Sequence, residues 1–271
     1  SFPVPLFEGA KLIENPVNQE LLTKRYTEEA VAWLEQQNSD SPFFLYLSHN
    51  MPHAPIFASP AFQGRSEGGR YGDVIEELDW SVGQVLHTLE KKDMEKDTLV
   101  IFTSDNGPWT MFGPHGGTAL PLRGEKGTSW EGGFRVPGIF YWPGTIAPAQ
   151  IGDVAANLDL YATFAALAGG QEPLRKPGYR SLDLTPALLE GKPSPRTKWL
   201  FGRAAFRSGD YKIHRTSKLR SSDPDTRKRE PSTSHEPPLL FNVREDMGET
   251  KNLTTQHPEL TERLLAEMEA F

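Results

Sequence analysis

Two short apolar runs, FFLYL at 43–47 and LVIF at 99–102, constrain the fold more than any other feature of the sequence. Between them, residues 73–92 carry apolar side chains at helical spacing. Strand, helix and strand in this order predict a βαβ unit with a right-handed crossover. Because both runs are apolar on both faces, we expect a covered parallel sheet and therefore an α/β fold.

Other segments complete the predicted architecture. A helix is predicted over 19–37 and a third strand over 138–142, and further helices are expected at 157–168 and 184–190. From residue 198 the pattern predicts an antiparallel hairpin, then a strand at 239–243 and a terminal amphipathic helix. Residues 217–238, between the hairpin and this strand, are polar and broken by prolines. We interpret them as a mobile loop and not as a binding element. We predict an α/β domain over 1–197 and a small α+β subdomain with an antiparallel sheet over 198–271.

The composition excludes several classes of protein. The 271 residues have a formal net charge of −7, so no basic excess is available for a nucleic-acid partner. No apolar run approaches the roughly 20 residues that span a bilayer, and residues 1–5 carry no signal peptide. Cysteine is absent, which excludes disulfides, thiolate metal ligands and a cysteine nucleophile within the chain.

Polar side chains follow the two predicted strands. Asp105 and Asn106, in TSDNG, offer one charged and one neutral oxygen, which together suit a hard cation such as Ca²⁺. If the two strands are neighbours, these residues share a sheet edge with the cluster at 48–53. The alternative is an ordinary tight turn, because Asp-Asn-Gly favours turns with or without a metal.

Two further residues could take part in catalysis. His53 lies between prolines in MPHAP and could protonate a leaving oxygen, although a structural loop histidine is an equal alternative. His49 resembles it but is less constrained. Lys126 follows Glu125 in a glycine-rich stretch and could bind an anionic group, or it could be a solvated surface lysine.

The order and spacing of these motifs resemble those of the type I sulfatases. The similarity is carried by FFLYLSHNMPHAPIFAS, RYGDVIEELDWSVGQVL, TLVIFTSDNGPW, HGGTALPLRGEKGTSWEGGFRVPGIFYWPG and LLFNVREDMGETKNL. Within this family the chain is most similar to the arylsulfatase A and N-acetylgalactosamine-6-sulfatase branch of the alkaline phosphatase superfamily. The resemblance implies a mixed sheet flanked by helices and hydrolysis of aryl or carbohydrate sulfate esters.

The resemblance also implies roles for individual residues. Asp105 and Asn106 match ligands of a Ca²⁺ ion, and Lys126 matches the lysine that binds the sulfate oxygens. His53 matches the histidine that contacts the sulfate and assists the leaving group, and His115 is expected to line the substrate pocket. The resemblance to this family also implies a periplasmic, lysosomal or extracellular location.

The chain departs from the family in one important respect. The family's nucleophile is a formylglycine made from a C/S-x-P-S-R stretch, and this sequence contains no such stretch. We therefore expect the chain to be a C-terminal part of a sulfatase that is inactive alone. Two alternatives stay open: a non-catalytic remnant that binds anions or a partner, and a phosphodiesterase or phosphonate hydrolase of the same superfamily.

Overall fold

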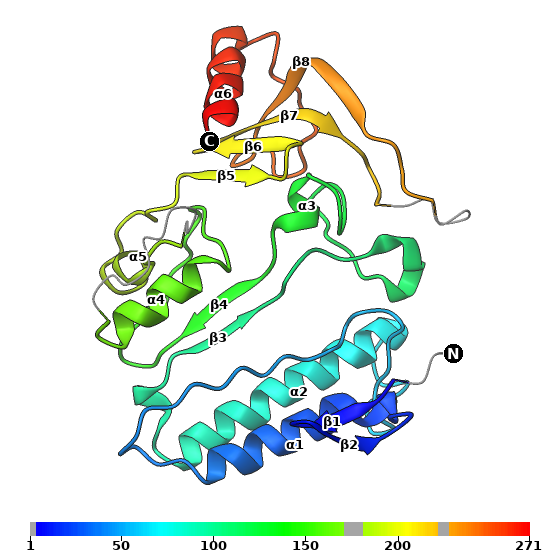
Figure 1. Ribbon diagram of the computed structural model, residues 1–271, viewed down its shortest axis with the longest axis vertical. Coiled ribbons are helices and arrows are strands. Elements are labelled where there is room, and N and C mark those ends of the chain that lie inside the picture. Colours follow the sequence, from blue (N-terminus) through cyan, green and yellow to red (C-terminus); the bar gives the residue numbers. More distant parts are fainter. Residues whose placement is uncertain (1–3, 171–180, 222–227) are drawn as a thin grey trace. The chain divides into compact units, whose positions relative to one another are not determined.

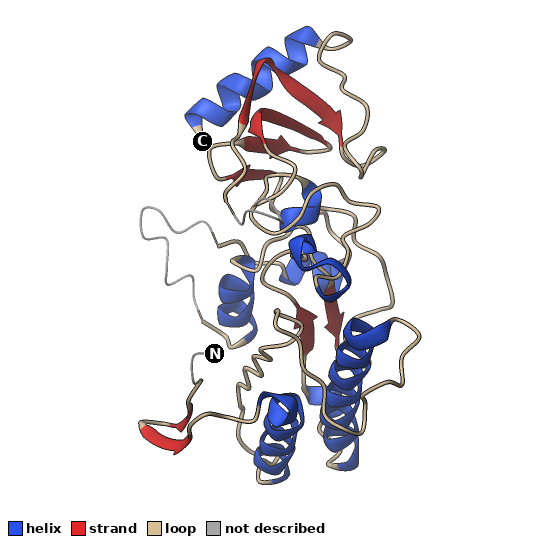
Figure 2. Cartoon of the chain, turned by 90° about the vertical axis from the view of Figure 1, so that its right-hand side faces the viewer, coloured by secondary structure: helices blue, strands red, loops and turns tan. Residues whose placement is uncertain are grey.

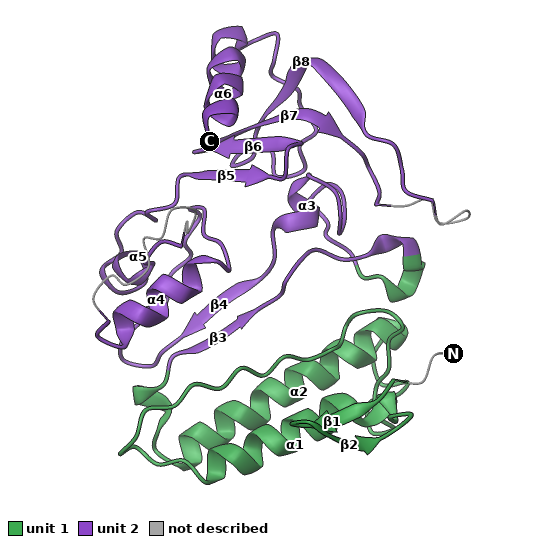
Figure 3. Ribbon diagram, viewed as in Figure 1, with its two compact units in different colours: residues 1–98, 112–117 green, residues 99–111, 118–271 purple. Residues whose placement is uncertain are grey.

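The computed structural model describes residues 4–170, 181–221 and 228–271, and the chain forms two compact units. Unit 1 comprises residues 1–98 and 112–117, and unit 2 comprises residues 99–111 and 118–271 (Figure 3). No helix among the described residues is long and apolar enough to cross a bilayer.

Unit 1 is built on two long helices, α1 (Leu22–Glu35) and α2 (Gly69–Lys91), which lie side by side (Figure 1). An antiparallel hairpin of β1 (Leu6–Glu8) and β2 (Lys11–Glu14) precedes them. Two 3-10 turns of the described residues lie wholly in unit 1, η1 (Gln19–Leu21) and η2 (Glu95–Asp97), while η3 (Thr110–His115) begins in unit 2 and ends in unit 1. The apolar stripe of α2 packs against the segment that leads into it, with Val74 and Leu78 in contact with Ile56 and Phe62. Burying this stripe is the main source of stability for a pair of amphipathic helices.

Unit 2 begins with a two-stranded antiparallel sheet of β3 (Val100–Thr103) and β4 (Gly138–Tyr141). Its helices are the short α3 (Glu131–Phe134), α4 (Asp159–Leu167) and α5 (Thr185–Glu190). The buried carboxylate of Asp159 accepts hydrogen bonds from the backbone of Ala156 and Leu182 and pairs with Arg196 at 2.5 Å. This pair therefore fixes the start of α4 and the residues just before it.

The C-terminal part of unit 2 is a four-stranded antiparallel sheet covered on one face by α6 (Pro258–Ala270) (Figure 2). Its strands, in spatial order, are β5 (Lys198–Phe201), β6 (Ala205–Ser208), β7 (Tyr211–Ser217) and β8 (Thr233–Asn242). Side chains alternate between the two faces along β7, and Ile213 lies on the face that packs against Leu264 and Met268 of α6. Lys212 and His214 consequently lie on the other face, where both are buried.

The predicted βαβ unit is wrong. Residues 43–47 form no strand among the described residues, and β3 pairs with β4 in antiparallel register, with Val100 opposite Tyr141, so no parallel sheet forms there. Side chains over 43–50 alternate between half-buried and exposed, with Phe44 69% and Tyr46 79% exposed. The run therefore has the period of a strand, but no neighbouring strand of the described residues pairs with it.

The other predicted elements are largely confirmed. The helices correspond to α1, α2, α4, α5 and α6, the strands at 99–102 and 138–142 to β3 and β4, and the mixed α/β class with an antiparallel C-terminal sheet is present. The predicted loop at 217–238 is wrong from Thr233 onward, because β8 begins there; residues 222–227 lie outside the described part. The predicted division at 197/198 stays a prediction.

Candidate functional site

Asp105 and Asn106 directly follow β3, at a point that the fold holds in place. Asn157 donates its amide hydrogen to the carbonyl oxygen of Ser104 at 2.8 Å, which fixes the residue before Asp105. The exposed Asp105 carboxylate has no hydrogen bond or ion pair with any described residue, and Asn106 uses its amide nitrogen to contact the carbonyl of Gly107 at 3.3 Å. The carboxylate of Asp105 and Oδ1 of Asn106 are therefore uncommitted among the described residues, just beyond the end of this strand.

These oxygens fit a hard cation only as part of a larger ligand set. Ca²⁺ takes six to eight oxygen ligands, with carboxylate and amide oxygens among its usual choices. Within the described residues, no cluster of three or more His, Cys, Asp or Glu could hold a metal. The donor chemistry of Asp105 and Asn106 thus suits calcium, but a complete site needs ligands beyond this pair.

The backbone ties this strand end to the loop that carries Lys126. Gly107 donates its N–H to the carbonyl of Gly133 at 3.1 Å, and Lys126 donates its N–H to Pro108 at 2.8 Å. A Cβ atom on Gly107 would lie 1.8 Å from the carbonyl oxygen of Gly132. The two loops therefore approach so closely that only glycine fits at position 107. The backbone of Lys126 is held at Pro108, two residues after Asn106.

The Lys126 side chain is half-buried and lies over an aromatic ring. Its Nζ is 5.2 Å from the centroid of the Trp109 ring, a distance at which the ring face attracts a cation. No carboxylate of the described residues forms a salt bridge with it. An ammonium in this position has the charge that an anionic ligand needs, and the binding role predicted for Lys126 stays a prediction.

His53 lies in unit 1, in the turn that follows residues 43–49. Its Nδ1 is 2.8 Å from the carbonyl oxygen of Ala54. Because a carbonyl can only accept, Nδ1 donates a hydrogen in this contact. The geometry suits a proton donor but does not by itself distinguish that role from a structural one.

Three buried polar residues of α2 hold the segment that contains His53. Asp73 accepts backbone hydrogen bonds from Gly64, Arg65 and Ser66 at 2.8 to 3.0 Å, and Glu77 accepts one from Ser59 at 2.8 Å. Ser81 contacts Nε2 of His49 at 3.0 Å. We call this set, spaced four residues apart, the α2 ladder. It anchors the chain on both sides of His53.

His49 is a structural residue of unit 1. Burial lowers the pKa of its imidazole, and its Nδ1 is buried with no hydrogen-bond partner among the described residues. Its Nε2 contact with Ser81 joins a chain that continues to Thr27 of α1 at 2.6 Å. The sequence favoured His53 over His49 as a catalytic candidate, and the half-buried position of His49 is consistent with that preference.

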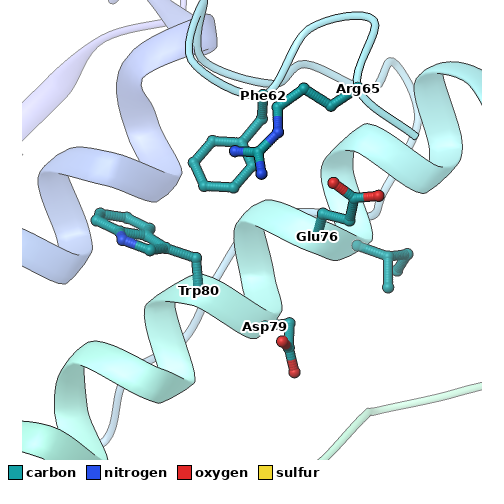
Figure 4. A pocket seen from close by; sticks show the side chains of 6 residues that line it. Phe62, Arg65, Glu76, Asp79 and Trp80 are labelled. Atoms are coloured by element: carbon teal, nitrogen blue, oxygen red, sulfur yellow. The ribbon is translucent and has the colours of Figure 1, made fainter.

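His115 is exposed at the end of η3 and belongs to unit 1, as His53 does. Asp105, Asn106 and Lys126 all belong to unit 2, where the structure brings their backbones together. The roles predicted for all five residues stay predictions. A surface hollow of about 510 Å³ in unit 1 contains none of them (Figure 4); its lining comprises Phe62, Arg65, Ile75, Glu76, Asp79 and Trp80.

A buried charged network, which the sequence did not reveal, supports the far end of the Lys126 loop. Lys212 contacts Glu131 at 2.9 Å and Glu249 at 3.3 Å, and His214 contacts Glu249 at 2.7 Å. Glu249 also accepts the backbone N–H of Glu131 at 2.7 Å. We call these residues the Glu131–Glu249 network. The one available signal was the alternation of YKIHR, which put a lysine and a histidine on the same face of a strand.

This network makes stability depend on pH. Burial lowers the pKa of His214 to about 4, and the hydrogen bond that Nε2 donates to Glu249 opposes this shift in part. The unfolded chain binds a proton near pH 6.5 while the folded chain stays neutral at this residue, so stability should fall as the pH drops from 6.5 to about 4. The loss should be on the order of 3 kcal/mol for that residue.

Denaturant unfolding at several pH values measures this effect. His214→Gln, which keeps a donor but does not titrate, should remove this part of the acid destabilisation. The matched control is His87→Gln, since His87 is exposed on α2. Identical pH profiles for wild type and His214→Gln would contradict the assignment.

Comparison with known proteins identifies the family to which the chain belongs. A sequence model of the Sulfatase family matches residues 6–170, and a model of the C-terminal region of aryl-sulfatase matches residues 201–271. The chain therefore belongs to the sulfatase family, and the resemblance found in its motifs is confirmed.

Individual relatives agree with this assignment. The chain is 39% identical over 266 residues to arylsulfatase A of Bos taurus, covering 93% of this chain and 52% of that protein. It is 38% identical over 229 residues to N-acetylgalactosamine-6-sulfatase of Mus musculus, covering 78% and 43%. A crystal structure of a sulfatase from Pseudoalteromonas sp. aligns with a TM-score of 0.86 at 29% identity, covering 97% and 55%. The chain spans about half the length of the curated relatives it matches.

Proposed function

We propose that the complete protein is a calcium-dependent sulfuric ester hydrolase. By the complete protein we mean the product of the whole open reading frame that encodes this chain. Its substrates are aryl or carbohydrate sulfate esters. The observation that carries this proposal is the backbone junction at Gly107, which holds an uncommitted carboxylate, an amide oxygen and a cationic side chain on adjoining loops. The names of the relatives, which include an arylsulfatase and an amino-sugar sulfatase, support this substrate range.

The chemistry of a sulfate ester gives each residue a task. Cleavage releases an alkoxide or phenoxide, while the sulfate oxygens stay anionic. Lys126 binds those oxygens through its ammonium, and His53 gives a proton from Nε2 to the departing oxygen. His115 contributes to the substrate pocket. Asp105 and Asn106 hold the calcium ion, which supplies positive charge against the sulfate when it is bound.

The nucleophile is proposed to lie in a part of the complete protein that this chain does not contain. The 271 residues include no cysteine and no S-x-P-S-R stretch, and they span about half the length of their relatives. We infer that the remaining part supplies the formylglycine and further calcium ligands. On this proposal the 271-residue chain alone is inactive.

The proposal extends to partners and location. The substrate is a sulfated glycan or an aryl sulfate, and no nucleic acid takes part, since the net charge of the chain is −7. We propose an exported protein in the periplasm, the lysosome or the exterior, in keeping with the family resemblance.

Sulfate release by the complete protein tests this function. With calcium present, the protein should liberate inorganic sulfate from an aryl sulfate or from a sulfated amino sugar, and removal of calcium by a chelator should abolish release. The 271-residue chain should release none under the same conditions. An aryl phosphate and a phosphonate ester serve as matched substrates.

The outcomes separate the alternatives. Faster turnover of the phosphate or phosphonate ester would favour a phosphodiesterase or phosphonate hydrolase. Binding of calcium or a sulfated glycan without turnover of any ester would favour a non-catalytic protein. Either result would overturn the proposed hydrolase.

A further inference from the structure

A buried carboxyl group lies immediately before Lys126. Glu125 is 1% exposed, and no salt bridge with any described residue compensates it. Its Oε1 accepts hydrogen bonds from the backbone N–H and the hydroxyl of Ser221 at 2.8 and 3.1 Å, and its Oε2 accepts one from the hydroxyl of Thr110. Burying a carboxyl group with only neutral donors costs folding free energy, so a role beyond packing is expected.

Glu125 and its two partner residues, Thr110 and Ser221, come from three different segments. Thr110 follows the strand end that carries Asp105 and Asn106, while Ser221 lies beyond the end of β7. Glu125 therefore connects the strand end, the Lys126 loop and the C-terminal sheet through one carboxyl group. A neutral residue of the same size could fill the space but would not accept all three hydrogen bonds.

The connection continues to the ammonium of Lys126. The hydroxyl of Ser221 accepts a hydrogen bond from Nε1 of Trp109 at 3.0 Å, and the Trp109 ring lies under Lys126 Nζ. The contacts thus run from Glu125 to Ser221, from Ser221 to Trp109, and from Trp109 to Lys126. The peptide bond between Glu125 and Lys126 closes the circle. A Cβ on Gly127 would lie 3.0 Å from the Cβ of Ser221, so this serine also packs on the residue after the lysine.

The geometry points to Glu125 as a positioning residue for Lys126. By fixing Ser221 and Thr110, its carboxyl group sets the indole on which the ammonium rests, and so sets the place where an anionic sulfate group binds. This inference rests on the proposed function only in identifying the anion as sulfate. The inference gives the segment 218–221 a part in anion binding. This part is played by Ser221 and not by the basic side chains of the segment.

A double-mutant cycle tests this role. The variants Glu125→Gln, Lys126→Ala and the double variant are made in the complete protein, and isothermal titration calorimetry measures the affinity for inorganic sulfate. Glu125→Gln should weaken sulfate binding by about 10-fold when Lys126 is present, within the usual range for coupled neighbours. In the Lys126→Ala background the same change should alter the affinity by less than about 2-fold.

A matched control distinguishes positioning from general damage. Glu77 is also a 1% exposed glutamate, but it holds Ser59 in unit 1. Any effect of Glu77→Gln on sulfate affinity should be the same with and without Lys126. An equal loss for Glu125→Gln in both backgrounds would overturn the inference. If Glu125→Gln does not fold, Ser221→Ala replaces it, because this change removes one donor to Glu125 and the acceptor for Trp109.

The result can be told apart from failure of the proposed function. A wild-type protein that binds sulfate but hydrolyses no sulfate ester would overturn the hydrolase, while the calorimetric cycle would still decide the role of Glu125. A wild-type protein with no affinity for sulfate would overturn the positioning role as well.

Discussion

Replacing Asp105 by alanine in the complete protein should lower kcat/KM for sulfate esters by about 100-fold to 1,000-fold or more, the usual loss when a group that stabilises transition-state charge is removed. Its carboxylate is exposed and uncommitted to any described residue, so the change should leave the fold intact. The loss should come from the bound cation, which depends on this charge. Steady-state release of sulfate from an aryl sulfate, measured over a range of calcium concentrations, gives the effect.

Calcium binding provides a second measurement that does not need turnover. Calorimetry should show a large drop in calcium affinity for Asp105→Ala, and excess calcium should restore part of the activity. The control is Asp97→Ala, which removes an exposed aspartate of η2. Unchanged calcium affinity in Asp105→Ala, with activity intact, would show that the Asp-Asn-Gly sequence is only a turn.

Gly107→Ala should be the most destabilising single substitution near the site. The added Cβ would lie 1.8 Å from the Gly132 carbonyl oxygen and 2.8 Å from its carbon, which are backbone atoms and cannot rotate away. The two loops would have to separate, which would break the bonds from Gly107 to Gly133 and from Lys126 to Pro108. We expect a loss of about 3 kcal/mol or more in unfolding free energy, at the upper end for overpacking.

Chemical denaturation of the wild type and the variant measures this loss. Gly152→Ala in the same unit is the control, since nothing lies within 4 Å of its added Cβ and it should change stability by less than about 1 kcal/mol. Activity of the folded fraction should also fall, because Lys126 and Asn106 would no longer be held together. A variant as stable as the control would show that the two loops can move apart without cost.

The sequence predicted helices better than it predicted strand pairing. The stripes of α1, α2 and α6 were readable because each helix buries one face locally. The run at 43–47 carried a strand-like composition, but pairing depends on partners elsewhere in the chain. The direction of β4 relative to β3 could not be read from either strand, since an apolar run is compatible with parallel and antiparallel neighbours.

The candidate site was predictable only in part. Motif order pointed to the candidate residues, whose roles stay predictions, but it did not point to the groups that hold them: Asp105, Asn106, Lys126, His53 and His115 are the candidates. Glu125 looked like a charged neighbour of Lys126 in a glycine-rich stretch. Its burial depends on Ser221, which is 96 residues away in the sequence. Contacts of this kind come from tertiary packing and leave no local pattern.

The α2 ladder has a consequence for how this protein can vary. Its rungs, Asp73, Glu77 and Ser81, repeat every four residues, so each rung lies about 6 Å further along the helix axis than the one before. The spacing of these residues along the helix therefore fixes the position of the segment that contains His53. A one-residue insertion between Glu77 and Ser81 would turn Ser81 by about 100° away from His49. Substitutions on the exposed face of α2 should leave these contacts in place, whereas an insertion between two rungs should break them.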